Sequence, residues 1–328
     1  MKLAVLGAGA WGTAISIRLA QRHEVTLWTR DREFATELAA QRVNRRYLAE
    51  LRLPDSVRIS AVLADALARC ELILVATTTA GLRPILQQLA AADVAVPTVW
   101  LCKGFDSATL QLPHQVAAAE LPAEIPRGVL SGPSFAAEVA RGLPTALTLA
   151  SRDADFAARV ARELHDPALR IYSSDDVMGV EVAGALKNVM AIAAGISDGI
   201  GLGHNARAAL ITRGLAEITR LGLKLGGRLE TFMGLAGAGD LVLTCTGDLS
   251  RNRRVGLSLA RGDALDQVLR DLGHVAEGVY TARAVSRLAR ELAVEMPIVR
   301  AVCRVLDENV PVRVAVQELL QRDSRPEY

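Results

Sequence analysis

The stretch KLAVLGAGAWG, Lys2–Gly12, decides the fold of the N-terminal half of the chain. Its first five residues form a short apolar run that is typical of a buried parallel strand, and a helical segment is predicted from about 11 to 22. Gly7, Gly9 and Gly12 between them fit the pattern GxGxxG. The first glycine allows a tight turn, the second lets the backbone approach a pyrophosphate, and the third permits close helix–strand contact. The plainer alternative is a glycine turn that only packs a helix onto a sheet.

The rest of the chain indicates two domains of different texture. Strand-like and helix-like stretches alternate up to about residue 177, which predicts a parallel sheet covered on both faces. The predicted strands are 2–6, 25–28, 72–76, 98–101, 129–130 and 146–149, and the later helices are 31–42, 61–68, 82–92 and 153–164. From 178 onward the periodicity is helical and strand runs are absent. We therefore predict an α/β, Rossmann-type, doubly wound dinucleotide-binding domain over 1–177 and an all-α substrate and catalytic domain over 178–328.

The overall composition excludes several classes of protein. The 38 basic and 36 acidic residues give a net charge of +2, whereas a general nucleic-acid binder needs a clear basic excess. The four cysteines and five histidines are scattered, so we expect neither a disulfide framework nor a metal site. Glycines and Arg18 interrupt the apolar run after Lys2, and charged or polar residues interrupt the run 182–203. These patterns predict a cytoplasmic protein without a membrane span.

The end of the second predicted strand is where a cofactor ribose is expected. The strand ends in Trp28-Thr29-Arg30-Asp31. Arg30 is suited to a 2′-phosphate, and Asp31 to a ribose hydroxyl. The pattern favours NADP without excluding NAD. Alternatively, both residues are solvated charges at the start of a helix.

Two later turns follow predicted strands, at the sheet edge where ligands bind in such folds. Lys103 comes directly after the strand 98–101, and Ser131-Gly132-Pro133-Ser134 follows the strand 129–130. Gly132 and Ser134 are able to offer a backbone N–H and a hydroxyl to a substrate. The alternatives are a surface lysine and a structural turn.

The predicted helix 181–194 carries a candidate acid–base group. Gly184, Lys187, Asn188, Ala191 and Gly195 share one face at spacings of three and four residues. The small residues on this face suit close packing against a backbone or a ligand. A lysine held there loses solvent, which lowers the pKa of its amine toward a useful range. The alternative is a lysine that extends its amine to water.

A third group lies in the stretch 231–254. Glycines at 234, 237 and 239 let the backbone come near a ligand, and Asp240 follows them, either as a functional carboxylate or as a helix N-cap. Ser250 is suited to cap the next helix, with Arg251 and Asn252 in its first turn. A helix N-terminus with a guanidinium is well built for a phosphate.

Taken in order, these residues resemble the bacterial NAD(P)-dependent glycerol-3-phosphate dehydrogenases almost from end to end. The similar stretches are Gly7–Ala14, Asn44 with Tyr47-Leu48 and Leu53-Pro54, Lys103-Gly104, Ser131–Ala136, Lys187–Gly195, Asn205 with Ala208–Leu221, Thr231–Asp240, Ser250–Asn252 and Glu277–Val279. The resemblance implies reversible hydride transfer between NADPH or NADH and dihydroxyacetone phosphate, which gives sn-glycerol 3-phosphate for phospholipid synthesis. The resemblance also implies a homodimer.

The resemblance also implies roles for individual residues. Lys187 is expected to be the proton acceptor in glycerol phosphate oxidation, with Asp240 as a second catalytic residue. Arg251 and Asn252 are expected to hold the phosphate. The predicted substrate site comprises Lys103, Gly132, Ser134, Lys187, Asn188, Asp240, Thr244, Ser250, Arg251 and Asn252. The predicted cofactor site comprises Gly7, Gly9, Ala10, Trp11, Gly12, Arg30, Tyr47, Lys103, Ala136, Arg251, Val275 and Glu277.

Two stretches depart from the family pattern. Ala76-Thr77-Thr78-Thr79-Ala80 stands where a Val-Pro-Ser-like turn is expected, and Ala49-Glu50 replaces the usual Pro-Gly after Tyr47-Leu48. These changes affect the edge of the nicotinamide pocket and one loop on the cofactor side. Two rival functions are a different two-domain dehydrogenase, which the Ser250–Asn252 clamp disfavours, and a non-catalytic dinucleotide sensor, which needs neither Lys187 nor Asp240.

Overall fold

The computed structural model describes residues 1–272 and 276–322. Its contacts divide the chain into two compact units, Met1–Glu181 and Val182–Tyr328, which we call the first and the second unit. The long helix α8 (Val177–Gly199) contains this division, and the predicted boundary at 177/178 lies at the start of the same helix. The domain boundary at 177/178 remains a prediction, four residues before the division by contacts. Each unit is described by itself.

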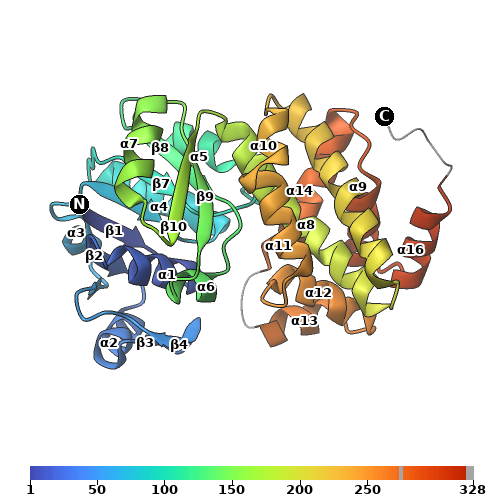
Figure 1. Cartoon of the computed structure of the whole chain (residues 1–328), viewed down its shortest axis with the longest axis horizontal. Helices are drawn as coiled ribbons and strands as arrows, with labels where there is room; N and C mark the ends of the chain where they lie inside the picture. Colours follow the sequence, from blue (N-terminus) through green and yellow to red (C-terminus); the bar gives the residue numbers. More distant parts are fainter. Residues whose placement is uncertain (273–275, 323–328) are drawn as a thin grey trace. The chain divides into compact units, whose positions relative to one another are not determined.

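An eight-stranded sheet forms the centre of the first unit (Figure 1). Its strands follow the order β10 (Leu169–Ser174), β9 (Thr145–Ala150), β8 (Arg127–Ser131), β7 (Thr98–Trp100), β6 (Leu72–Val75), β1 (Lys2–Leu6), β2 (Glu24–Trp28) and β5 (Arg58–Ser60). Six of the seven pairs are parallel, which confirms a doubly wound sheet, whereas β8 and β9 are antiparallel. The predicted parallel sheet is therefore confirmed for every pair but this one. The helix between β8 and β9, α6 (Ala136–Ala140), has only five residues, whereas a parallel return usually needs a full crossover helix.

The elements that sequence reasoning missed in the first unit are short or only half-buried. The strand β10 lies at the edge of the sheet, and exposed residues stand between its buried ones. The strands β3 (Val43–Asn44) and β4 (Leu48–Arg52) form a separate antiparallel pair. The remaining helices of this unit are α1 (Ala10–Leu19), α2 (Arg32–Gln41), α3 (Leu63–Leu67), α4 (Thr79–Ala91), α5 (Pro113–Glu120) and α7 (Ala154–Leu164).

The described part of the second unit contains helices and no strand, which confirms the all-α prediction (Figure 1). After α8 come α9 (Gly203–Lys224), α10 (Leu229–Met233), α11 (Asp240–Thr246), α12 (Arg251–Ala260), α13 (Leu265–Leu272), α14 (Glu277–Glu291), α15 (Pro297–Asp307) and α16 (Val312–Leu320). A single π-helical turn, η1 (Leu235–Gly239), precedes α11. Such turns occur frequently at functional sites.

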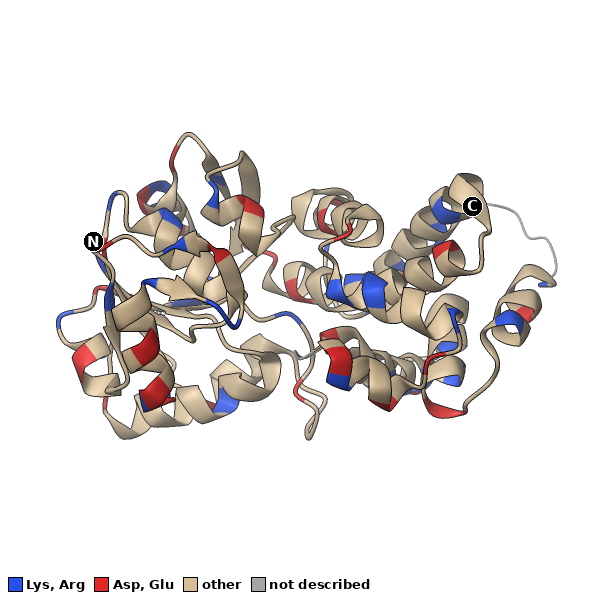
Figure 2. Cartoon of the chain, turned by 90° about the horizontal axis from the view of Figure 1, so that it is seen from below, with Lys and Arg blue, Asp and Glu red and all other residues tan. Residues whose placement is uncertain are grey.

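The helix α8 is the apolar core helix of the chain. Its length and composition alone would suit a membrane span, but 94% of its most apolar window is buried inside the protein. Burial of this kind is typical of the central helix of a globular protein. Charge is not concentrated on either unit, because basic and acidic residues are interspersed along the ribbons of both (Figure 2).

Candidate active site

The glycine turn between β1 and α1 has the geometry that the sequence predicts. Gly7 has a φ of +121°, and a Cβ there would lie 2.7 Å from the carbonyl oxygen of Ala76. A Cβ on Gly12 would collide with the carbonyl oxygen of Gly7. Gly9 differs from both, because a Cβ there would meet no atom of the chain within 4 Å. The fold itself thus requires Gly7 and Gly12, whereas Gly9 leaves room for an approaching group.

The N-terminus of α1 is suited to an anion. The helix has ten residues, no side-chain cap and no acidic residue in its first turn. Its first N–H groups and its dipole therefore favour a phosphate group. The buried hydroxyl oxygen of Thr77, which follows β6, also lacks a hydrogen-bond partner among the described residues. An open glycine, an uncapped helix and an unsatisfied hydroxyl together fit a dinucleotide.

Asn44 stabilises the glycine turn, and sequence reasoning assigned it no role. Its side-chain amide is completely buried and donates to the carbonyl oxygen of Ala8 at 2.9 Å and to Thr13 Oγ1 at 2.7 Å. Its oxygen accepts from the backbone N–H of Tyr47 at 3.1 Å. A buried amide that is satisfied in this way fixes the shape of the turn. The only sequence signal for it was its place in the family motif with Tyr47.

Arg30 and Asp31 differ in what they offer a ribose. Asp31 caps α2 by accepting from the backbone N–H of Phe34 at 3.0 Å, and its other oxygen accepts from Arg46 at 3.1 Å. The hydrogen bond from Phe34 is the main cause that lowers the pKa of Asp31 below its ordinary value. The interpretation of Asp31 as a charge at a helix start is therefore confirmed. Arg30 is exposed at the end of β2.

Lys103, Gly132 and Ser134 meet at one carbonyl group. The Gly132 oxygen accepts from Lys103 Nζ at 3.0 Å and from Ser134 Oγ at 3.1 Å. Gly132 has a φ of +134°, which favours glycine at this position. Lys103 is half-buried, so the alternative of a plain surface lysine is wrong. The hydroxyl of Ser134 builds part of the turn, as the second alternative held.

The other predicted residues of the first unit lie in or near these turns. Trp11 and Ala136 are half-buried in the first turns of α1 and α6, and Tyr47 is 40% exposed with its ring edge-to-face against Phe34. The departure Ala49-Glu50 lies within β4, where the Glu50 carboxylate pairs with Arg141. The structure thus places this departure in a strand that pairs with β3.

Lys187 and Asp240 form a buried ion pair in the second unit. Lys187 lies on α8 and is 8% exposed, and its Nζ donates to Oδ1 of Asp240, which is completely buried. The hydroxyl of Thr244 donates to the Asp240 backbone oxygen at 2.6 Å and approaches Oδ1 at 3.3 Å. The alternative of a lysine that extends its amine to water is contradicted, because Lys187 is buried against Asp240. The alternative of an N-capping aspartate is contradicted as well, because the N-cap of α11 is Gly239. A buried charge pair of this kind is costly unless its geometry is good.

The two asparagines of the predicted site form a hydrogen bond with each other. Asn252 Nδ2 donates to Asn188 Oδ1 at 3.0 Å, and Asn252 Oδ1 accepts from the backbone N–H of Gly278 at 3.0 Å. Asn252 thus connects α8, α12 and α14. Within the described residues, one of its two amide hydrogens is used for Asn188 and the other remains for a phosphate.

Ser250 is the N-cap of α12, as the sequence predicts. Its hydroxyl accepts from the backbone N–H of Arg253 at 3.2 Å. Arg251, the first residue of the helix, is exposed, yet desolvation by the surrounding protein lowers the pKa of its guanidinium, and the charge of Glu277 partly opposes this. Glu277 begins α14. The predicted cofactor residue Val275 lies outside the described residues.

Two further features of this region correct or complete the sequence interpretation. A Cβ on Gly237 would collide with the backbone of Phe232, so that glycine serves packing within the chain rather than a ligand. Burial raises the pKa of the Cys245 thiol, on α11, to about 12. That thiol stays protonated at neutral pH and is unsuited to act as a nucleophile.

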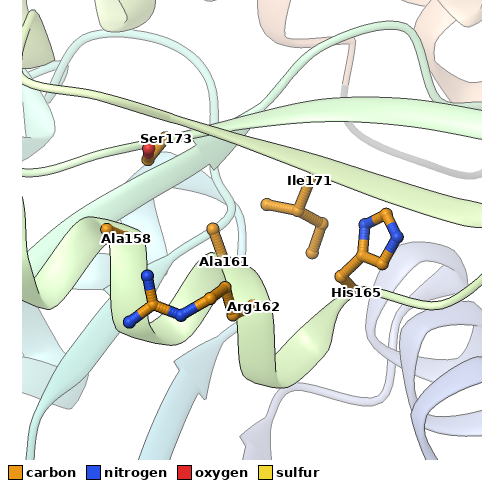
Figure 3. A pocket seen from close by; sticks show the side chains of 6 residues that line it. All are labelled: Ala158, Ala161, Arg162, His165, Ile171 and Ser173. Atoms are coloured by element: carbon orange, nitrogen blue, oxygen red, sulfur yellow. The ribbon is translucent and has the colours of Figure 1, made fainter.

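A separate surface pocket lies in the first unit, between α7 and β10 (Figure 3). It is lined by Ala158, Ala161, Arg162, His165, Ile171 and Ser173. None of these is a predicted site residue. The pocket is therefore distinct from the glycine turn and from the Lys187–Asp240 pair.

Comparison of the sequence and of the fold with known proteins identifies the family of this chain. Family models described as the N-terminus and the C-terminus of NAD-dependent glycerol-3-phosphate dehydrogenase match residues 2–157 and 176–317. The chain is 59% identical to glycerol-3-phosphate dehydrogenase (NAD(P)+) of Nitrosospira multiformis, over 100% of this chain and 99% of that protein. The corresponding enzyme of Thiobacillus denitrificans is 58% identical over 100% of both chains. The crystal structure of glycerol-3-phosphate dehydrogenase from Coxiella burnetii superposes with a TM-score of 0.93, at 42% identity and 98% coverage of each chain. The chain belongs to the NAD-dependent glycerol-3-phosphate dehydrogenase family.

Proposed function

We propose that this protein is an NAD(P)-dependent sn-glycerol-3-phosphate dehydrogenase. It reduces dihydroxyacetone phosphate reversibly to sn-glycerol 3-phosphate, which supplies glycerophospholipid synthesis. The observation that carries the proposal is the buried Lys187–Asp240 pair, tied through Asn188 and Asn252 to a capped helix that begins with Arg251. A proton-transferring amine and a phosphate anchor thus belong to one packed group of helices.

The first unit supplies most of the proposed cofactor-binding groups. The open Gly9 position and the N-terminus of α1 suit the pyrophosphate. Thr77 follows the carboxyl end of β6, and Gly132 follows that of β8. Ligands bind at the carboxyl ends of strands in doubly wound sheets. The bound nicotinamide supplies the hydride that C2 of the triose phosphate accepts.

Lys187 supplies the proton. Asp240 pairs with the Lys187 ammonium and compensates its charge in this buried position, since a buried cation needs a paired anion. In the reducing direction the ammonium stabilises the negative charge that develops on the C2 oxygen and then gives that oxygen a proton. In the oxidising direction the neutral Nζ accepts the hydroxyl proton.

Arg251 and the first turn of α12 hold the phosphate. A guanidinium forms two parallel hydrogen bonds to phosphate oxygens, and the helix N-terminus adds backbone N–H groups. The arginine opposes the helix dipole, and a bound anion compensates for this. Lys103 and Ser134, in the first unit, are the further groups assigned to the substrate.

The cofactor preference follows from the end of β2. Asp31 already uses both carboxylate oxygens, for the cap of α2 and for Arg46, whereas Arg30 is exposed. A cation that has no acceptor among the described residues favours the 2′-phosphate of NADP over the bare ribose of NAD. We further propose a cytoplasmic enzyme and a homodimer.

The experiment is a spectrophotometric assay at 340 nm with dihydroxyacetone phosphate and either NADPH or NADH. The expected result is oxidation that depends on the triose phosphate, with a higher kcat/KM for NADPH. Absence of oxidation with both cofactors would overturn the proposed function. A higher kcat/KM with NADH would overturn the cofactor preference alone.

A further inference from the structure

Arg253 lies in the first turn of α12 but serves a different purpose from Arg251. Its side chain is 10% exposed, and its Nε and Nη2 both donate to Oδ2 of Asp198, at 3.0 and 2.7 Å. Its remaining nitrogen Nη1 donates to Asp248 at 2.9 Å. The charge of Arg253 is therefore neutralised inside the protein, and this arginine has no role as a second phosphate anchor.

Asp198 belongs to α8, the helix that also carries Lys187 and Asn188. It is 13% exposed and also accepts from Arg207 of α9, at 3.0 Å. The Arg253–Asp198 pair therefore links the start of α12 to the last turn of the helix that carries the proposed proton donor.

Glycines bring α8 and α12 into backbone contact at this place. A Cβ on Gly195 would collide with the carbonyl oxygen of Arg253, and a Cβ on Gly256 would collide with that of Ile192. Backbones this close have little freedom to slide past each other, because any shift creates steric overlap. Gly195, one of the small residues on the α8 face noted in the sequence, is thus explained by packing against α12.

The first turn of α12 consequently contacts α8 at two points. Asn252 bonds to Asn188 at one point, and Arg253 bonds to Asp198 at the other. Arg251 precedes both of these residues in the chain and remains exposed. The contacts that fix its backbone are therefore those of its two successors.

We propose that Arg253 and Asp198 are positioning residues for the phosphate of the substrate. Their ion pair fixes the first turn of α12 on α8 and thereby sets where Arg251 lies relative to Lys187. The inference rests on the proposed function, because it assigns the phosphate to Arg251. It adds that the distance between the phosphate anchor and the proton donor, and hence the fit to a three-carbon phosphate ester, is set by the α8–α12 contact.

The test uses Arg253→Lys and Asp198→Asn in the full chain. Lysine keeps the charge of Arg253 but cannot donate through two nitrogens to Asp198, so the position of the turn is no longer fixed. We expect KM for dihydroxyacetone phosphate, and the inhibition constant of inorganic phosphate against it, to rise by roughly tenfold or more. KM for NADPH is expected to change less, because Arg251 is one of several predicted cofactor residues and most of the others lie in the first unit. Arg251→Ala provides the full loss of the anchor for comparison.

Arg207→Lys is the matched control, because Arg207 contacts the same carboxylate from α9 rather than from α12. It is expected to leave both constants unchanged. Arg253→Lys combined with Asp198→Asn is expected to have no larger effect than either single change, since both remove one interaction. If Arg253→Lys does not fold, Asp198→Asn alone gives the same comparison.

The outcomes separate this inference from the proposed function. No turnover of dihydroxyacetone phosphate by the unaltered chain would overturn the proposed function and this inference together. Normal turnover by the unaltered chain, with variants that lose only kcat while the phosphate inhibition constant is unchanged, would overturn this inference alone. That second pattern indicates a smaller folded fraction and not a displaced anchor.

Discussion

Gly9 and Gly12 show that two glycines of one motif are needed for different reasons. The backbone of Gly9 has a φ of −74°, which alanine also adopts, and its missing Cβ points at no protein atom. Gly12 instead allows α1 to lie against the carbonyl oxygen of Gly7. One glycine therefore serves the ligand, and the other serves the fold.

This difference predicts the behaviour of two matched variants. Gly9→Ala is expected to change the free energy of unfolding by no more than about 1 kcal/mol. It is expected to weaken NADPH binding by roughly tenfold or more, which corresponds to at least about 1.4 kcal/mol. Gly12→Ala is expected to destabilise the fold by about 1–3 kcal/mol, as overpacking does. Urea unfolding and NADPH fluorescence titration measure the two quantities. Unaltered NADPH affinity in Gly9→Ala would show that the cofactor does not approach this position.

Individual residues also show where sequence reasoning reached its limit. The local pattern around Asp240 is equally compatible with an N-cap and with a functional carboxylate. Only the packing of α11 against the rest of the second unit, which places Asp240 beside Lys187, decides between them. The roles of Asn44 and Arg253 depend in the same way on partners far along the chain, Ala8 and Asp198.

At the level of elements, the sequence predicted best where a strand is buried on both faces. The strands β1 and β6 are continuous apolar runs, and their residues are almost all buried. The strands β4 and β10 were missed, since they carry charged or exposed residues at alternate positions. The antiparallel pairing of β8 with β9 could not be predicted, because strand direction depends on the connection and not on the strand's own composition.

Glu217 links two helices of the second unit. It lies on α9, is 3% exposed, and its carboxylate accepts from the backbone N–H groups of Ile298 at 2.7 Å and Val299 at 3.3 Å. These groups begin α15, whose N-cap, Met296, provides no side-chain bond. Burial raises the pKa of Glu217 from 4.5 to about 7, although the two N–H groups oppose this.

This raised pKa predicts how stability depends on pH. The folded chain binds a proton at Glu217 between about pH 4.5 and 7, where the unfolded chain does not, so the associated stability is lost as pH rises through 7. Glu217→Gln has no such group. We expect the free energy of unfolding of the unaltered chain, relative to this variant, to fall by about 3 kcal/mol between about pH 4 and pH 8. Urea unfolding of both proteins at the two pH values measures it, and a difference that is independent of pH would contradict the assignment.

For the whole molecule, the division into two units gives each a separate spectroscopic signal. The three tryptophans, Trp11, Trp28 and Trp100, all lie in the first unit, which holds most of the predicted cofactor residues. Tryptophan fluorescence therefore reports the unfolding of that unit. The helical second unit contributes mainly to far-ultraviolet circular dichroism.

Because most of the predicted cofactor residues lie in the first unit, a bound cofactor is expected to stabilise that unit. At a concentration about one hundred times its dissociation constant, NADP+ is expected to raise the free energy of unfolding by about 2.7 kcal/mol. The urea midpoint followed by tryptophan fluorescence is expected to rise accordingly. If this midpoint stays constant while NADP+ shifts only the circular dichroism transition, the cofactor has been assigned to the wrong unit.

The variant Lys187→Arg tests most directly whether Lys187 transfers the proton. The new guanidinium would keep a positive charge beside Asp240, but it cannot give up its proton at neutral pH. We expect kcat for dihydroxyacetone phosphate reduction to fall by about 10²–10⁴-fold, the usual contribution of a general acid. NADPH affinity is expected to remain unchanged. A Lys187→Arg variant that retains the kcat of the unaltered chain would contradict the claim that Lys187 transfers the proton.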